Sequence, residues 1–205
     1  MFFNKKPFEA PKFDQEFFDE EWKLYIDCAE KSHPPFKSYL AQGAKLEDIT
    51  SAETAIACEF SEDLKHLLSL HDGSNEYQVL PGWELYSCAR IVDEWSVWEN
   101  LYQTQFKPEK YRCNPNGTIK GDEWWRLKWI PFCGDGGGNH LCLDMDPPAG
   151  GTIGQIITMW HDADNRDVAA KSLTGYISMI AGDIDDGDLV WNEEWGGIHL
   201  PIEKG

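Results

Sequence analysis

The chain has 205 residues, a length that suits one domain and allows a core that needs no metal or disulfide. Its 36 acidic and 18 basic residues give a formal net charge of -18, which argues against a nucleic-acid-binding protein and against docking on an anionic membrane. Hydrophobic residues make up 41% of the chain and aromatic residues 13%, which argues against intrinsic disorder.

The N-terminal residues and the cysteines indicate a cytoplasmic protein. Residues 1–7 lack the apolar run of a signal peptide, and no window approaches the ~20 apolar residues of a membrane span. The six cysteines form no C-x-x-C pair, so a structural zinc site has no support in the sequence. Without an export signal, we expect free and mostly buried thiols rather than disulfides.

The first half of the chain predicts four helices from apolar residues at helical spacing. Asp14 and Ser61 can cap two of them, while Pro34-Pro35 and Gly73 provide stops. The expected helices cover residues 13–31, 46–58, 62–70 and, after a turn and strand in 74–89, residues 90–103. The last of these has an aromatic stripe, which is typical of core packing rather than of a cofactor site.

The second half changes to a strand-like period after a polar, irregular segment at 104–128, which we interpret as an insertion. Strands are expected at 129–132, 140–146 and 153–160, with a turn of positive φ at 134–139 between the first two. Ser172 caps a final helix that reaches about Ala181. This order predicts a single α+β domain with a mainly antiparallel sheet packed against helices.

No motif in the chain predicts catalysis. The GDGGGNH run at 134–140 is followed by a strand and has no P-loop lysine, so we interpret it as a turn rather than a phosphate site. His140, Cys142, Asp144 and Asp146 share one strand face, where four ligands in a row cannot converge on one metal, and a partly solvated polar face is expected instead. The His161-Asp162 pair lacks the further His and Asp of a metal-dependent hydrolase.

Acidic residues are concentrated in the last third of the chain. Residues 135–205 hold 13 acidic and three basic residues, and their densest part runs from Asp183 to Glu194. This part is either a solubilising face or frayed tail, or a patch that steers a cationic protein. Trp191 and Trp195 lie within it, and an aromatic residue among charges is typical of an interface anchor, although either could fold back on the core.

Several of these segments occur together, and in this order, in a known family. SEDLKHLLSLHDGSNE (61–76), LPGWELYS (80–87), WIPFCGDGGGNHLCLDMDP (129–147), GGTIGQIITMWHD (150–162) and the closing helix KSLTGYISMIAGDI resemble the SUKH superfamily of the Smi/Knr type. Where the family usually has Leu-Pro before its third helix, this chain has Phe60-Ser61, and Ser61 can still cap.

The resemblance spans about residues 40–183. Together with the helical and charge patterns it leads us to expect an N-terminal helix in residues 1–35, a SUKH domain in 36–183 with an insertion at 104–128, and an acidic tail in 184–205. It implies no catalytic residues, cofactor or metal. Bacterial members look like immunity proteins that bind and block a toxin, often a nuclease, and yeast members are linked to cell-wall regulation.

The first hypothesis is therefore an immunity protein that occludes a basic protein toxin, with acidic side chains in place of nucleic-acid phosphates. It predicts a monomer that binds neither nucleic acid nor membrane. Its candidate partner contacts are Asp135, Asp162, Asp164, Asp183, Asp185, Asp186, Asp188, Trp191, Glu193 and Glu194. The alternative is a regulatory or scaffold protein of the cell-wall assembly regulator type. A third hypothesis is a metal-dependent hydrolase that uses His161-Asp162 or the strand at His140.

Overall fold

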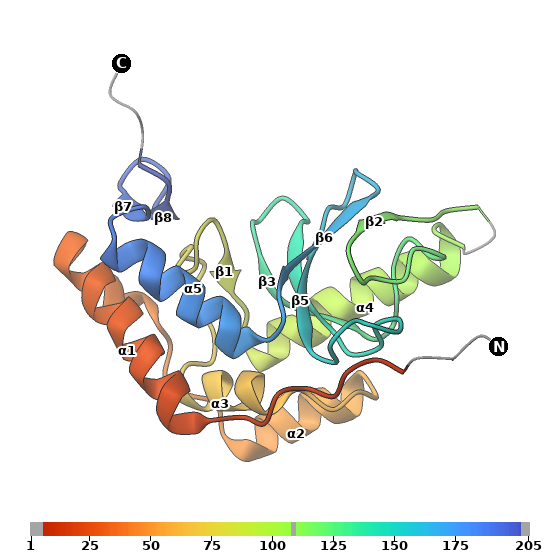
Figure 1. Ribbon diagram of the computed structural model, residues 1–205, viewed down its shortest axis with the longest axis horizontal. Coiled ribbons are helices and arrows are strands. Elements are labelled where there is room, and N and C mark those ends of the chain that lie inside the picture. The colour runs from red at the N-terminus through yellow and green to blue at the C-terminus, as the bar shows by residue number, and fades with distance from the viewer. Residues whose placement is uncertain (1–5, 108–109, 202–205) are drawn as a thin grey trace.

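The computed structural model describes residues 6–107 and 110–201 (Figure 1), and the helices and strands expected from the sequence occur in the expected order, with further elements between and after them. The helices are α1 (Gln15–Ser32), η1 (Phe36–Tyr39), α2 (Leu46–Ala55), α3 (Glu62–Leu70), α4 (Cys88–Thr104) and α5 (Leu173–Asp185). The strands are β1 (Glu84–Leu85), β2 (Asn114–Asn116), β3 (Trp129–Gly134), β4 (His140–Asp144), β5 (Gln155–Met159), β6 (Asn165–Ala170), β7 (Val190–Asn192) and β8 (Gly197–His199). The α+β class is confirmed.

Six of the strands form one sheet in the order β1-β3-β4-β5-β6-β2. Neighbouring strands are antiparallel except for β2 and β6, which are parallel. The remaining strands, β7 and β8, form a separate antiparallel hairpin. The expectation of a mainly antiparallel sheet is therefore correct.

Helices pack on both faces of the sheet. Trp98 of α4 donates its indole N–H to His140 of β4 on one face. Helix α5 lies on the opposite face. Its Tyr176 is buried near the Cys133 thiol of β3, and both the burial and this thiol raise the pKa of Tyr176. The long helix α1 packs along α5 (Figure 1). Within the described residues, none of the helices has the length and apolar run that a membrane crossing requires.

All three predicted N-cap residues occupy the expected positions, and two of them make the capping hydrogen bond. The Asp14 carboxylate accepts a hydrogen bond from the Phe17 amide at the start of α1, and the Ser172 hydroxyl accepts one from the Gly175 amide at the start of α5. Ser61 is the N-cap residue of α3, as expected, but its hydroxyl makes no capping hydrogen bond to a backbone amide. It donates instead to the buried carboxylate of Asp63.

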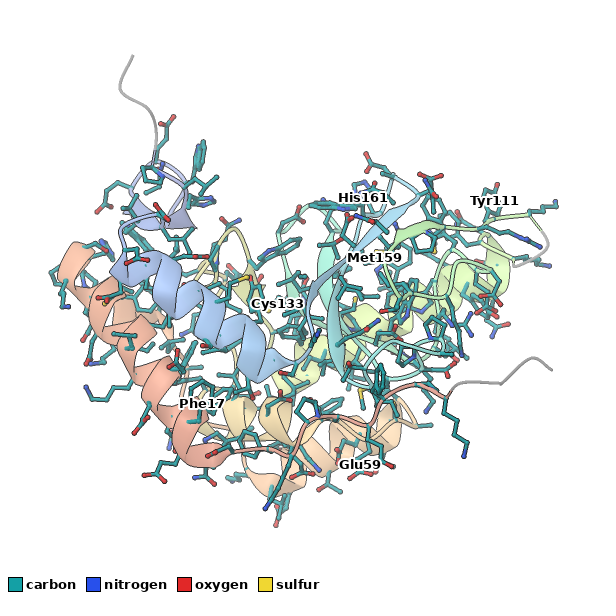
Figure 2. The ribbon with its side chains drawn as sticks, in the orientation of Figure 1. Phe17, Glu59, Tyr111, Cys133, Met159 and His161 are labelled. Carbon is teal, nitrogen blue, oxygen red and sulfur yellow. The ribbon has the colours of Figure 1, made fainter. Side chains whose placement is uncertain are left out.

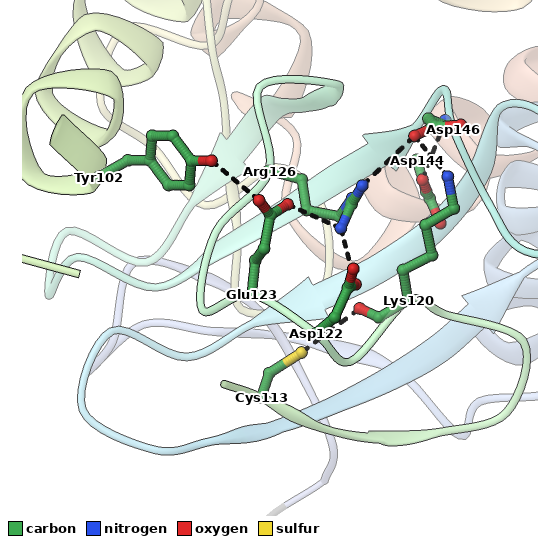
Figure 3. Close-up of polar contacts among 8 residues, drawn as sticks. All are labelled: Tyr102, Cys113, Lys120, Asp122, Glu123, Arg126, Asp144 and Asp146. Atoms are coloured by element: carbon green, nitrogen blue, oxygen red, sulfur yellow. Dashed lines mark hydrogen bonds and ion pairs between the residues drawn. The ribbon is translucent and has the colours of Figure 1, made fainter. Parts of the chain in front are cut away.

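The described part of the predicted insertion at 104–128 is tied to the sheet, whereas residues 108–109 lie outside the described residues. It supplies β2, which pairs with β6, and the ion-pair network of Figure 3. In that network Arg126 bonds Asp122 and Glu123, and it also reaches Asp146 at 3.5 Å. The hydroxyl of Tyr102 on α4 donates to Glu123, so the network joins the segment to both α4 and the end of β4.

The expected polar, partly solvated face of β4 is wrong. His140, Cys142 and Asp144 are buried, and Trp98 of α4 packs on His140, whereas Asp146 beyond the end of β4 is partly exposed. Desolvation by burial lowers the pKa of His140 to about 4 and raises the pKa of Asp144 to about 6. All six cysteines are buried and free, as expected.

The C-terminal segment folds back on the body of the molecule. Trp191 of β7 stacks on His33, which follows α1, with ring centroids 4.0 Å apart. Residues 184–201 of the predicted acidic tail therefore contain a packed hairpin, and residues 202–205 lie outside the described residues. The sequence patterns predicted neither this hairpin nor β6.

Candidate partner-binding surface

Three turns and the C-terminal segment meet at one end of the sheet. The register pairs Glu84 with Gly134 and His140 with Met159, so the turns at 81–84, 134–139 and 160–164 leave the sheet at the same end. Figure 1 places the β7–β8 hairpin on this side too, and His161 marks the turn before β6 in Figure 2. We call the three turns together with residues 183–199 the acidic edge.

Direct contacts make the acidic edge continuous. The His161 amide donates to the Asn139 side chain at 2.9 Å, which joins the turns before β4 and β6. Trp83 and Trp160 contact each other with centroids 6.0 Å apart, and the Gly82 amide donates to the Ile198 carbonyl of β8 at 2.9 Å. Segments far apart in the sequence therefore form one surface.

The glycine-rich turn holds Asp135 in a fixed position. Its carboxylate accepts hydrogen bonds from the Gly137 and Asn139 amides and from the Asn139 side chain. Burial alone would raise the pKa of Asp135, but these bonds outweigh it and hold the pKa below its usual value. The positive φ angles of Gly136 and Gly138, +77° and +95°, confirm the predicted turn geometry. The turn thus presents a fixed negative charge.

The turn between β5 and β6 adds two further carboxylates on the same side as Asp135. Asp162 and Asp164 are exposed, and the ring of His161 bonds Asn139 through Nδ1 at 3.0 Å. Nδ1 lies 4.0 Å from the Asp162 carboxylate, so the pair shares one turn without a close bond. Asp135, Asp162 and Asp164, which the sequence singled out separately, therefore border the same end of the sheet.

The remaining predicted carboxylates lie at the end of α5 and in the hairpin. Five of them, Asp185, Asp186, Asp188, Glu193 and Glu194, are exposed, and Asp183 is half-buried. The last turn of α5 contains no basic residue, although a helix C-terminus favours cations. Asp185 accepts a weak bond from the Cys28 thiol, and exposed Glu193 bonds the His33 ring at 3.0 Å.

The two tryptophans of this segment have different environments. Trp191 is half-buried in a ladder of stacked rings that includes His33 and Tyr39. Trp195 is 57% exposed, and its ring contacts His199 edge-on with centroids 4.8 Å apart. Trp191 therefore anchors the hairpin to the body, while Trp195 has the exposure that a partner contact requires.

Part of the acidic edge was not predicted from the sequence. Trp83 and Trp160 contribute half-buried aromatic rings, and Glu84 contributes a carboxylate whose pKa is raised by burial. These residues flank turns, and a Trp beside Pro81-Gly82 was the available signal. Their proximity could be recognised only once the strand order was known.

The geometry of His140 bears on the hydrolase hypothesis. Trp98 can only donate its N–H, so Nε2 of His140 must be the acceptor, and the neutral ring carries its proton on Nδ1. The hydrogen bond from Trp98 therefore occupies the lone pair of Nε2 that a general base would use to accept a proton. Within residues 6–107 and 110–201, no group of three His, Cys, Asp or Glu side chains is placed to hold a metal ion.

Comparison with protein families gives a match over most of the sheet and helices. A model of the SMI1/KNR4 family (SUKH-1) matches residues 43–179, which include α2 to α4 and the first half of α5. The match covers the turns at 81–84, 134–139 and 160–164 of the acidic edge and stops before its C-terminal segment.

Among curated proteins, three fungal relatives match most of the chain. A glucan synthesis regulatory protein of Neurospora crassa is 24% identical over 216 residues, covering 87% of this chain and 40% of the relative. The cell wall biosynthesis/cell cycle regulator smi1 of Schizosaccharomyces pombe is 24% identical over 196 residues, covering 88% and 39%. The cell wall assembly regulator SMI1 of Saccharomyces cerevisiae is 23% identical over 206 residues, covering 82% and 40%. The chain thus spans about two fifths of the length of these relatives.

Proposed function

Because the chain belongs to the SMI1/KNR4 (SUKH-1) family, we propose that it is a protein-binding regulatory domain of the cell-wall assembly regulator type. It acts by binding a partner protein rather than by transforming a substrate. The acidic edge binds this partner through a segment rich in Lys and Arg.

The observation that supports this proposal is the gathering of carboxylates and tryptophans at one end of the sheet. The edge combines exposed Asp162, Asp164, Glu193 and Glu194 with the exposed ring of Trp195. Its positively charged counterpart would be steered by the field of a chain with a net charge of -18. Aromatic rings among such charges supply the apolar contact area that binding hot spots need.

The names of the relatives favour regulation over toxin immunity. The three relatives described above are named as regulators, two of them of the cell wall and one of glucan synthesis. This supports the second of the hypotheses drawn from the sequence. Toxin immunity remains a prediction that uses the same acidic edge, and the identity of the natural partner would separate the two.

A selection from a library of random displayed peptides tests the binding mode. We expect peptides enriched at low salt to be rich in Lys and Arg. A variant with Asp162, Asp164, Glu193 and Glu194 all replaced by Lys should bind the most enriched peptide at least about tenfold more weakly, since close charge pairs contribute to affinity. Fluorescence anisotropy measures the affinity of each variant.

The matched control reverses exposed charges elsewhere. Glu20 on α1 and Glu47 on α2 are exposed and lie outside the acidic edge. The double variant Glu20→Lys, Glu47→Lys should keep the affinity within about twofold, because these charges are distant from the bound peptide. Selected peptides without a net positive charge, or equal losses in both variants, would contradict the proposal.

A further inference from the structure

A cavity of about 340 Å³ opens beside the acidic edge, between α4 and the turns before β4 and β6. Glu94, Val97, Trp98 and Leu101 line it from α4, at the spacing of one helix face. Gly138 and His161 line it from the two turns. Its volume lies at the lower end of the range for ligand pockets, which suits a single large side chain.

The walls of this cavity are held rigidly. Trp98 is fixed by its bond to buried His140 at 2.9 Å and by stacking on Trp125, with centroids 5.4 Å apart. Phe106 also lines the cavity, and the centroid of its ring lies 6.0 Å from that of Trp98. A preformed apolar wall reduces the entropy lost when a side chain binds.

The mouth of the cavity carries uncovered apolar surface. Val97 is 53% exposed although it lies on the cavity rim. Gly138, with φ of +95°, lies so close to the His161 ring that a Cβ there would be 3.4 Å from it, so turn and ring together border the cavity. The rim therefore has an apolar surface that no segment of the described chain covers.

The charges around the cavity, and its position next to the acidic edge, indicate what kind of segment would occupy it. His161 and Gly138 belong both to the cavity and to the acidic edge, so a segment bound along the edge passes its mouth. Asp162 lies next to His161, and Glu94 on the rim offsets Arg90, which it bonds at 2.7 Å. An occupant must therefore combine an apolar side chain with flanking positive charges.

We propose that this cavity is the anchor pocket of the acidic edge and receives one large apolar side chain of a Lys/Arg-rich partner segment. The inference rests on the proposed function and adds to it the partner's chemical pattern. Basic residues of the segment contact the carboxylates of the edge, and an aromatic residue, Leu or Met among them enters between α4 and His161.

The test uses the peptides selected in the display experiment as probes. They should share one large apolar residue within the basic stretch, and its replacement by Ala should weaken binding to the wild-type chain about tenfold or more, as at an interface hot spot. The variant Val97→Trp, which covers the pocket from its rim, should lose affinity to a similar degree. For the Val97→Trp protein, replacing the apolar residue of the peptide by Ala should cause no further loss of affinity.

The control is Ser96→Trp, on the next position of α4, which is exposed and outside the cavity. It adds the same side chain to the same helix and should leave the affinity within about twofold. If Val97→Trp and Ser96→Trp bind basic peptides equally well, the anchor pocket is wrong while the proposed function stands. If the selected peptides lack basic residues, the proposed function fails, whatever the two variants show.

Discussion

At the scale of single residues, His140 shows how burial fixes a protonation state. Its pKa is lowered to about 4, whereas an unburied histidine titrates near 6.5. The unfolded chain therefore binds the proton first as the pH falls. The stability that the neutral ring contributes is fully present above pH 6.5 and is lost as the pH falls towards 4.

We predict that the wild-type protein loses stability relative to the variant His140→Gln as the pH falls. Between pH 7.5 and 5 the difference in their free energies of unfolding should change by about 2 kcal/mol. The comparison with the variant is needed because Asp144, with its pKa raised to about 6, acts in the opposite direction. Its contribution is present below pH 3.8 and is lost as the pH rises through 6. Urea unfolding at the two pH values measures the change, and a constant difference would show that His140 is not buried neutral.

Gly134 occupies a position where the packing leaves no room for a side chain. A Cβ at this position would lie 1.7 Å from the hydroxyl oxygen of Tyr86, which is itself buried. We predict that Gly134→Ala destabilises the protein by about 2–3 kcal/mol, since the ring must move within a packed core. Gly137→Ala, in the same turn, meets only the Asp135 carboxylate at 3.3 Å and should have a much smaller effect on the melting temperature. Equal shifts for both variants would contradict this geometry.

At the scale of elements, α5 contains a glycine that the fold does not require. Gly182 has helical backbone angles, and a Cβ there would meet nothing within 4 Å. We predict that Gly182→Ala stabilises the protein by about 0.5–1 kcal/mol through helix propensity. Gly136 also has open space but a φ of +77°, so Gly136→Ala should destabilise it. Chemical denaturation of the two variants should give free-energy changes of opposite sign, and changes of the same sign would refute the conformational explanation.

The elements also show what the sequence could predict. Helices α1 to α5 could be predicted because apolar spacing and end residues such as Asp14 and Ser172 act locally. Strand β6 could not, because Asn165–Ala170 has no clear alternation. The β7–β8 hairpin depends on Trp191 stacking against His33, a contact between distant parts of the chain. The carboxylates of the candidate site could be recognised from charge density, but Trp83 and Trp160 required the strand order.

At the scale of the whole molecule, the charge distribution opposes stability at the end of α5. Its carboxylates lie where the helix dipole disfavours them, and no basic residue balances them in the last turn. We predict that Asp186→Lys raises the free energy of unfolding by about 0.5 kcal/mol and weakens binding of the selected basic peptides. A more stable protein with weaker binding separates a functional charge from a structural one. If the same variant binds these peptides unchanged, the end of α5 is not part of the binding surface.

The central claim is that carboxylates at one end of the sheet attract a basic partner segment. The most direct measurement is the association rate constant for a selected peptide, determined by stopped-flow fluorescence at several salt concentrations. We predict that this rate falls steeply with salt for the wild-type chain, and that the Lys variant of Asp162, Asp164, Glu193 and Glu194 has a lower rate and a flatter salt dependence. A rate that is the same in both proteins and independent of salt would contradict the account.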